Sequence, residues 1–513
     1  MNHWIILPIL IPAVVAPLLA MSVRHDIVLA RIFSMMSTVA LLLLGVGSVA
    51  ISSSGDIFIY SLGNWPAPIG IVLVLDKLAA MMLVVTALLG VCVLLYSMGG
   101  SDREGEHFHP LFQFQLMGLN GAFLTGDLFN LFVFFEVLLI ASYGLMNHGG
   151  GPARLRAGLQ YMTINLVGSS IFLVALGLIY GITGTLNMAD VAVKMRTIGQ
   201  GDLALLVTGI SLLIAVFGIK SAVFPLQFWL PGTYAHTCGV VAALFAIMTK
   251  VGVYAIIRVH SVLIDGNANS SVLAEPLQSV TEWLMPAAAI TLLLGTIGIL
   301  GAKNLSQQAA FMSLASIGTL LIAVAGFSNA SIASALYYLI HSTFAVAALF
   351  LIVDMIIPRR KGEGGALTLA GRFSSMGILG SLFFVTAIAV IGMPPLSGFI
   401  GKILILDALR SSTAWVAIWA LILVTSLLTM IGFTRSGSLL FWKSQQIETR
   451  LEIEDNTSTV IPLTAIFATL LLLVILTLGS ALIIPYLDGI AMQLSSPQNY
   501  INVVLGRSLE VLP

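Results

Sequence analysis

The chain has 513 residues, of which 58% are hydrophobic and only 9% are charged. Soluble domains carry about 25% charged residues, so this composition and a mean hydropathy of +1.06 exclude an ordinary soluble globule. The formal net charge is zero, which argues against a basic surface for nucleic acid and against an acidic tail. Cys92 and Cys238 both lie in apolar runs and indicate neither a disulfide framework nor a metal site.

Apolar runs long enough to cross a bilayer recur along the whole chain and predict an all-α polytopic membrane protein. The first run lacks the basic start and cleavage site of a secretory signal, so we interpret it as a span. Longer loops are expected only at 53–70, 184–201, 265–281, 358–372 and 437–459, and no extramembrane domain is expected. About fourteen spans are predicted, with starts near 4, 27, 71, 109, 128, 157, 202, 240, 283, 306, 330, 373, 413 and 460.

Positive charges favour one side of the membrane. If the N-terminus lies outside, the inner loops receive Arg24, Arg31, Arg103, Arg154, Arg156, Lys303, Arg359, Arg360, Lys361, Arg372, Arg435, Lys443 and Arg450. The outer loops then receive only Lys194, Arg196, Arg410 and Arg507. Because cytoplasmic loops are enriched in Lys and Arg, this bias predicts that both termini are extracytoplasmic and that the number of spans is even.

Proline interrupts two predicted spans, the seventh at Pro225 and the twelfth at Pro394 and Pro395. In lipid, the freed backbone groups are tolerated only where protein or a water-filled cavity satisfies them. The breaks lie five spans apart, which predicts two five-helix repeats, spans 4–8 and spans 9–13, of opposite orientation. Paired breaks in inverted repeats point to a transport site. The alternative is a pair of ordinary proline kinks, which are frequent in membrane helices.

The repeats divide the chain into four segments. We expect a three-helix segment at 1–108, the first repeat at 109–264, the second, inverted repeat at 283–436, and a loop with a C-terminal helix at 437–513. The shared position of the breaks within the two repeats is the basis of this division.

Glu136 lies in the middle of an apolar run that extends from Leu128 to Leu145. A carboxylate at that depth costs roughly 2.5–3.5 kcal/mol on insertion scales, so it requires a buried partner or water. Lys220 precedes Pro225 by five residues and is a candidate partner. Such a pair would act as a switch, because attraction keeps the lysine charged and separation lets it release a proton. A purely structural partnership is the alternative.

Three further ionisable residues lie within apolar spans. Lys250 has about ten apolar residues on either side, which makes snorkelling to an interface a long reach. Lys402 follows the second break, which would return it toward the midplane. His341 titrates near physiological pH and suits a relay between lysines, although a lone membrane histidine also serves as a neutral hydrogen-bonding strut. With Glu136 and Lys220, these residues predict a path for protons or cations.

Other polar residues are expected nearer the membrane surfaces. His236 follows the first break and is a candidate for a cytoplasmic entrance. For Asp354, Asp127 and Arg258, capping, snorkelling or topology is favoured over a place in the path, although Asp354 is kept as a possible accessory residue of it. Asp76 is expected at the outer interface. No enzymatic motif, phosphate loop, or set of haem, flavin or iron–sulfur ligands is present, so we expect no catalytic site, no metal and no cofactor.

Three stretches resemble the antiporter-like family of proton-translocating membrane subunits. They are TGDLFNLFVFFE at 125–136, the run from 220 to 250 with its two prolines, and GMPPLSGFIGK at 392–402. The family includes large subunits of Mrp-type cation/proton antiporters and proton-pumping subunits of respiratory complex I and of membrane-bound hydrogenases. The resemblance covers essentially the whole chain, and the run from Gly121 to Gly144 looks most like the D-type subunits of the Mrp-type antiporters.

The resemblance implies roles for five residues. Glu136 matches the fifth-helix glutamate, Lys220 the seventh-helix lysine, Lys250 the eighth-helix lysine, His341 the eleventh-helix histidine and Lys402 the twelfth-helix lysine. In this scheme Glu136 and Lys220 form the switch, Lys250 and His341 carry the proton, and Lys402 closes the outlet.

The chain departs from the family pattern in two places. Many relatives carry a lysine four residues after the histidine, where this chain has Ala345, and an Asp-Leu-Lys pattern where it reads Asn304-Leu-Ser. The Ala345 departure predicts a central water chain that runs through His341, Ser342 and Thr343 instead.

The resemblance implies a component of a multisubunit antiporter in a bacterial inner membrane, in which proton entry drives export of Na⁺ or K⁺. It also implies partner subunits and a lipid environment. The first alternative is a proton-pumping subunit of a redox complex, which its partners would reveal. The second is a standalone solute transporter, which activity of the isolated chain would favour. Because a Na⁺ site requires several oxygen ligands, the metal cation path is left open between this chain and a partner.

Overall fold

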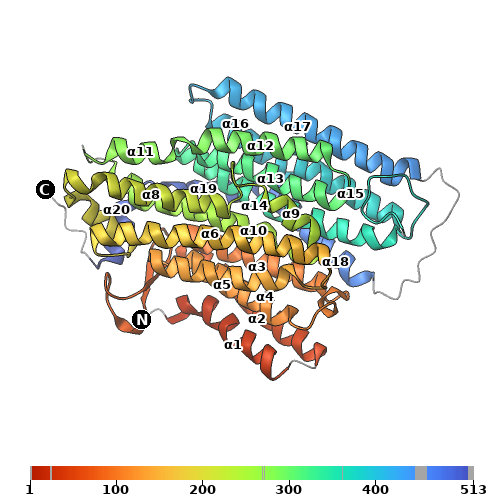
Figure 1. Cartoon of the computed structure of the whole chain (residues 1–513), viewed down its shortest axis with the longest axis horizontal. Coiled ribbons are helices and arrows are strands. Elements are labelled where there is room, and N and C mark those ends of the chain that lie inside the picture. The colour runs from red at the N-terminus through yellow and green to blue at the C-terminus, as the bar shows by residue number, and fades with distance from the viewer. Residues whose placement is uncertain are drawn as a thin grey trace.

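A computed structural model describes residues 3–23, 26–268, 270, 272–360, 362–444 and 459–506. Its helices run side by side along the longest axis of the molecule (Figure 1). Of the residues that carry the predicted charge bias, Arg24, Lys361, Arg450 and Arg507 lie outside the described part.

Twelve helices within the described residues are long and apolar enough to cross a membrane. At 1.5 Å per residue, about 20 residues cover the hydrocarbon core. These helices are α1 (Leu7–Met21), α2 (Ile27–Ser52), α3 (Lys77–Ser97), α5 (Leu128–Met146), α6 (Pro152–Thr183), α8 (Gln200–Lys220), α10 (Gly239–Val259), α12 (Leu284–Gly301), α13 (Leu305–Val324), α14 (Asn329–Ile356), α17 (Trp415–Gly437) and α18 (Val460–Leu478), some of them extended by a short helical turn.

Two shorter units complete the fourteen predicted spans. One is α4 (Phe108–Leu124), and the other is the broken pair α15 (Met376–Ile391) and α16 (Ser397–Ala408). The seventh span is also broken, since α8 ends at Lys220 and α9 (Trp229–His236) follows it. The prediction of a polytopic helical protein with two broken spans is therefore confirmed.

The order of helices repeats along the chain. Three unbroken helices, a broken one and an unbroken one follow each other as α4, α5, α6, α8 with α9, and α10. The same order returns as α12, α13, α14, α15 with α16, and α17. This order is the one expected of two five-helix repeats, while the division of the chain into four segments stays a prediction.

Several expected loops contain regular structure. The loop predicted at 53–70 holds β1 (Phe58–Ser61), which pairs antiparallel with β2 (Val72–Leu75), with Phe58 opposite Leu75. The run VLVL in β2 is apolar enough to resemble the start of a span, but its β-branched valines suit a strand, so α3 begins only at Lys77. Short helices also occupy regions assigned to loops or to the single C-terminal helix: α7 (Met188–Lys194), α11 (Ala274–Glu282), α19 (Ser480–Leu494) and α20 (Pro497–Val504).

The core of the bundle is built from α10, α13 and α14. Of the apolar membrane-spanning stretch that includes α10, 100% of the residues are buried within the protein, whereas 39% are buried in α6. α10 is therefore an interior helix, and α6 has a face left for lipid or a partner. α10 packs against α14, α8 and α3, and it lies near the middle of the bundle in Figure 1. Two of the predicted path residues, Lys250 and His341, are carried by these interior helices.

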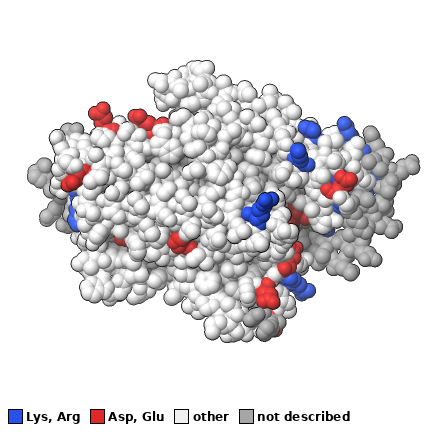
Figure 2. All heavy atoms as spheres, in the orientation of Figure 1, with Lys and Arg blue, Asp and Glu red and all other residues white. Residues whose placement is uncertain are grey.

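Charges gather at the ends of the helices. On the face shown in Figure 2 most of the surface is uncharged, and most of the visible Lys and Arg lie toward the right-hand end. The first helical turn, at His3–Ile6, and α20 both contact the β1–β2 hairpin region, so the two ends of the described chain lie on one side of the bundle. This agrees with an even number of spans.

Candidate functional site

Glu136 lies on α5 and is half-buried. Its carboxylate accepts a short hydrogen bond from the hydroxyl of Ser169, which lies on the neighbouring helix α6. A carboxylate in an apolar span needs such a donor, because no water from the bilayer core is available to it. The expected buried partner of Glu136 is therefore present in the form of a neutral side chain.

Lys220 is the last residue of α8 and is 5% exposed. Its ammonium donates to the Oδ1 atom of Asn165 on α6 over 3.3 Å and lies 5.9 Å from the centre of the Phe135 ring. No ion pair within 4 Å joins Lys220 to Glu136 among the described residues, although the two charges remain close enough for a Coulomb interaction. The predicted switch pair is thus found in a separated arrangement, each member bonded to α6.

The backbone groups released at the first break are satisfied from inside the bundle. The indole of Trp229 donates to the carbonyl of Ile219 over 3.1 Å, and the amide of Phe224 donates to the hydroxyl of Thr291 over 2.9 Å. This is the condition under which a helix break is tolerated at membrane depth. Both prolyl bonds of the two breaks, before Pro225 and before Pro395, are cis.

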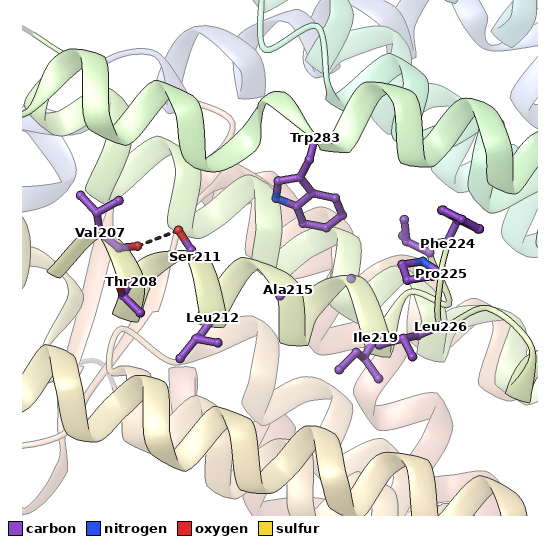
Figure 3. A pocket seen from close by; sticks show the side chains of 12 residues that line it. Val207, Thr208, Ser211, Leu212, Ala215, Ile219, Phe224, Pro225, Leu226 and Trp283 are labelled. Carbon is purple, nitrogen blue, oxygen red and sulfur yellow. Dashed lines mark hydrogen bonds between the residues drawn. The ribbon is translucent and has the colours of Figure 1, made fainter. Parts of the chain in front are cut away.

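One side of this break borders an apolar groove of about 490 Å³, which lies between α8 and Trp283 (Figure 3). The hydroxyl of Ser211 in the groove donates to the carbonyl of Val207 in its own helix over 2.7 Å. A Cβ added to Gly218 would lie 3.2 Å from the Trp283 ring, so the glycine allows the ring to pack close to α8. The break thus presents an apolar surface on this side and places Lys220 toward α6.

Lys250 lies on α10 and is 0% exposed. Its ammonium has no hydrogen-bond partner among the described residues, and neither has the hydroxyl of the adjacent Thr249. Buried polar groups without a protein partner mark sites of internal water or function. Lys250 is close to the first break, because Gly252 packs so tightly against Ser221 that an added Cβ would lie 2.3 Å from its hydroxyl.

His341 lies on α14, is 1% exposed, and shares a hydrogen bond of 2.9 Å with the hydroxyl of Ser397 at the start of α16. It lies within reach of the charges of both Lys250 and Lys402. A Cβ on Gly398 would approach the His341 ring to 2.8 Å and the carbonyl of Ala389 to 2.2 Å. The second break therefore packs directly against the histidine.

Lys402 lies on α16, half-buried, and bridges the second break. Its ammonium donates over 2.7 Å to the carbonyl of Ile391, the last residue of α15, and over 2.7 Å to the hydroxyl of Ser426 on α17. The lysine thus satisfies a carbonyl that the break sets free, as Trp229 does at the first break. Lys220 precedes its break, whereas Lys402 follows its own.

The predicted central hydroxyls are engaged with their own helix. Ser342 and Thr343 donate to the carbonyl of Leu339 over 3.2 and 2.8 Å. Their oxygen lone pairs stay available as acceptors, and both residues are buried beside His341. A water chain through them stays a prediction.

His236 and Asp354 lie together on a cavity of about 360 Å³ at one end of the bundle. Asp354 accepts from the hydroxyl of Tyr96 and from the backbone amide of Gly239, both over 2.9 Å. His236 is exposed, and its carbonyl accepts from Arg154 over 3.1 Å. Gly239 lies eleven residues before Lys250 on α10, three helical turns away and on the same face, so this cavity is suitably placed for an entrance.

Two buried ion pairs were not anticipated. Asp76, expected at the interface, is 2% exposed and pairs with Arg258, with one contact of 2.8 Å, while also capping α3. The Arg258 guanidinium lies 5.4 Å from the rings of both Tyr254 and Tyr500. Asp76 lies at the start of α3, and its place at the outer interface stays a prediction. Its pairing with Arg258 was not predicted, because the two residues are 182 positions apart in sequence.

The second ion pair joins Asp102, in a short turn before α4, to Arg31 through contacts of 2.6 and 2.7 Å. His109 also contacts Asp102, at 3.2 Å. Burial alone would raise the pKa of Asp102, but the hydrogen bonds and charges of Arg31 and His109 outweigh it, and the pKa is lowered from its usual value. This cluster ties α2 to α4 outside the path.

The five site residues, which we call the row, are Glu136 on α5, Lys220 on α8, Lys250 on α10, His341 on α14 and Lys402 on α16. Of these helices, α8 packs against α10, α10 against α14, and α14 against α16. Among the described residues no group of three or more His, Cys, Asp or Glu is arranged to hold a metal. Sequence reasoning missed the neutral partners of the row: Asn165, Ser169, Ser397 and Ser426. Serine and asparagine are common in membrane helices, so no signal in the sequence distinguished them.

A bundle of apolar helices with two breaks and a row of buried and half-buried ionisable side chains defines the class of polytopic ion-translocating membrane proteins. The chain belongs to the family described as "NADH:quinone oxidoreductase/Mrp antiporter, TM", which matches residues 125–429 and so includes the whole row.

Proteins of known name are similar over most of the chain. It is 40% identical to the D-type subunit of a probable K(+)/H(+) antiporter from Rhizobium meliloti (strain 1021), over 86% of this chain and 88% of that one. It is 39% identical to the D-type subunit of the Na(+)/H(+) antiporter from Bacillus subtilis (strain 168), over 98% and 100%. A chain in the "Structure of Mrp complex from Dietzia sp. DQ12-45-1b" superposes with a TM-score of 0.86 at 26% identity, over 99% and 100%.

Proposed function

We propose that this chain is the proton-translocating subunit of a multisubunit Na⁺/H⁺ or K⁺/H⁺ antiporter, in which proton influx drives efflux of the monovalent cation. The relatives that are named as D-type antiporter subunits support this over nearly the full length. The observation that carries it in the structure is the row of buried and half-buried ionisable residues, since such groups within membrane helices mark ion paths.

In the proposed mechanism, protons enter at the cavity beside His236 and Asp354. The Glu136–Lys220 switch controls whether Lys220 retains its proton, and Lys250 and His341 carry protons through the midplane. Lys402, held at the second break, closes the outlet. The unpartnered ammonium of Lys250 supports this role, because a buried lysine without a counter-charge gives up its proton more readily than a paired one.

We place the protein in a bacterial inner membrane with both termini extracytoplasmic. The bias of Lys and Arg toward one end of the bundle supports this orientation. Other antiporter subunits are its expected partners, as the likeness to a chain of the Mrp complex suggests, together with lipid. The experiment below identifies the cation as Na⁺ or K⁺. Its repetition with single subunits would show whether the cation crosses this chain or a partner.

The test uses everted membrane vesicles from a host without its own antiporters, carrying this chain with its full set of partner subunits. A pH gradient is imposed, and its collapse on addition of Na⁺ or K⁺ is recorded for wild type and for Glu136→Ala. Glu282→Ala, at an exposed glutamate on α11, is the matched control. Cation-dependent collapse in wild type and the control, but not in Glu136→Ala, is expected, and it also names the cation.

Absence of cation-dependent collapse in wild type would contradict antiport and favour a redox-driven proton pump. Activity of the chain without its partners would favour the standalone transporter. Equal collapse in wild type and in Glu136→Ala would remove Glu136 from the mechanism.

A further inference from the structure

Two buried polar side chains of α6 face the predicted switch. Asn165 is 2% exposed and Ser169 is 5% exposed. They are four residues apart on one helix, so they lie one turn apart on the same face. Neither is ionisable, and neither belongs to the set of residues that the family resemblance implies.

Ser169 is bonded to the acid of the switch. Its hydroxyl donates to the Oε1 atom of Glu136. The adjacent Ser170 is exposed, and its hydroxyl donates instead to the carbonyl of Leu166 in its own helix over 3.0 Å. Serines within membrane helices commonly satisfy themselves in the second way, so the contact of Ser169 with another helix is specific.

Asn165 is bonded to the base of the switch, and its orientation is determined by its other contact. The Nδ2 atom donates to the carbonyl of Tyr161 over 2.9 Å, which directs Oδ1 toward Lys220, 3.3 Å from its ammonium. The two helices pack in van der Waals contact here, since a Cβ on Gly168 would lie 3.9 Å from the Lys220 side chain. α6 therefore supplies a donor for the acid and an acceptor for the base.

Ionisable groups of neighbouring helices also face this region. Tyr143 on α5 lies within Coulomb range of Glu136, and Glu136 within Coulomb range of Lys220. α10, which packs against α8, carries Lys250, and α4, which packs against α5, carries His109, already bound to Asp102. Direct hydrogen bonds to the two charges come from α6: Ser169 contacts Glu136, and Asn165 contacts Lys220.

We propose that Ser169 and Asn165 are positioning residues of the switch: they hold Glu136 and Lys220 apart by offering each a neutral partner that competes with the direct ion pair. This inference rests on the proposed function and deepens it. In a low-dielectric interior, the Coulomb attraction between a carboxylate and an ammonium in direct contact is strong, so the pair separates slowly. With a partner waiting on α6, each charge exchanges one hydrogen bond for another when the pair opens, so the lysine releases its proton without leaving the carboxylate unsatisfied.

The test removes the hydroxyl of Ser169 or of Ser170 in separate variants. Each variant is measured in the complete complex by the vesicle assay described above. Ser169→Ala is expected to lower the antiport rate about tenfold to a hundredfold, in line with the loss of one hydrogen bond to a charged group. The released carboxylate then pairs with Lys220, which retains its proton, so the pH profile of antiport moves to higher pH by about half a unit or more. Ser170→Ala, the same change one residue along, is expected to leave rate and profile unchanged.

Two more variants separate positioning from a structural role. Ser169→Thr restores the hydroxyl and is expected to restore the wild-type pH profile. Ser169→Cys has a similar size but a weaker hydrogen-bond donor, so it replaces the alanine variant if that variant does not assemble. Its pH profile is expected to shift in the same direction. Equal behaviour of the Ser169 and Ser170 variants, in an active complex, overturns the inference alone. Absence of cation-dependent collapse in wild type overturns the proposed function and this inference with it.

Discussion

At the scale of single residues, the row is defined by how each charge is satisfied. Glu136, Lys220 and Lys402 each have a neutral hydrogen-bonding partner, and Lys250 has none among the described residues. Asp76 and Arg258, by contrast, pair directly and completely. In the proposed mechanism, the charges that move protons are thus held by exchangeable contacts. The charges of Asp76 and Arg258 are held by each other, so removing either one leaves the other buried without its partner.

This difference predicts opposite effects of removing two buried cations. Lys250→Met replaces an unpaired ammonium by an apolar side chain of similar length, so the melting temperature of the purified complex should be unchanged or higher. Arg258→Met leaves the Asp76 carboxylate buried without its partner and should destabilise by about 3–5 kcal/mol. Thermal unfolding of both variants beside wild type measures this. A loss in Lys250→Met equal to that in Arg258→Met would mean that Lys250 has a structural role.

The residues that carry charge were predictable, and their partners were not. A Glu, Lys or His within an apolar run is expensive in lipid and therefore visible in the sequence. Ser169 and Asn165 are uncharged and cost less in lipid than an ionised side chain, and their contacts depend on how α6 packs against α5 and α8. The separated arrangement of Glu136 and Lys220 follows from those contacts, which no local pattern encodes.

At the scale of elements, the two breaks differ in which side chain bonds the freed carbonyl, and so in whether the nearby lysine is engaged there. The first is closed by Trp229, which leaves Lys220 free to contact α6, and the second is closed by Lys402 itself. Proline indicated both breaks correctly, because it cannot continue the hydrogen bonding of a helix. The hairpin of β1 and β2 was missed, since a run of four apolar residues does not distinguish a strand from the start of a helix.

The packing of the second break predicts the effect of a single methyl group. A Cβ on Gly398 would lie far too close to the Ala389 carbonyl and to the His341 ring, so Gly398→Ala must displace α16 or the histidine. We expect transport to fall at least about tenfold, as misplacement of a reacting group by about 1 Å does in other sites. Gly377→Ala, where no atom lies within 4 Å, is the matched control in the same vesicle assay. Full activity of Gly398→Ala would show that His341 need not occupy this position.

At the scale of the whole molecule, ion pairs at the two ends join helices that are distant in sequence. Arg258 joins α10 to α3 at one end, and Asp102 joins α2 to α4 at the other. The membrane fold and the order of the spans were predictable from hydropathy, because lipid requires every span to be apolar. The long-range pairs were not, since 182 and 71 residues separate their members.

The Asp102 cluster predicts a pH dependence of stability that is independent of transport. The pKa of Asp102 is lowered in the folded protein, so its contribution is fully present above the ordinary aspartate value of about 3.9. It is lost as the pH falls through the lowered pKa, because protonation breaks the bond to Arg31. Unfolding of the detergent-solubilised complex between neutral and acidic pH should show this loss in wild type, whereas Asp102→Asn should be less stable at neutral pH and lack that part of the acid dependence. Parallel acid profiles for the two would contradict it.

In the proposed mechanism, protons cross the middle of the bundle through Lys250. The most direct measurement compares cation-driven proton movement in vesicles that hold the assembled complex with wild-type chain or with Lys250→Met. If the row is the path, the variant assembles with wild-type stability and shows no cation-dependent collapse of the pH gradient. Collapse at the wild-type rate in Lys250→Met would contradict a path through this residue.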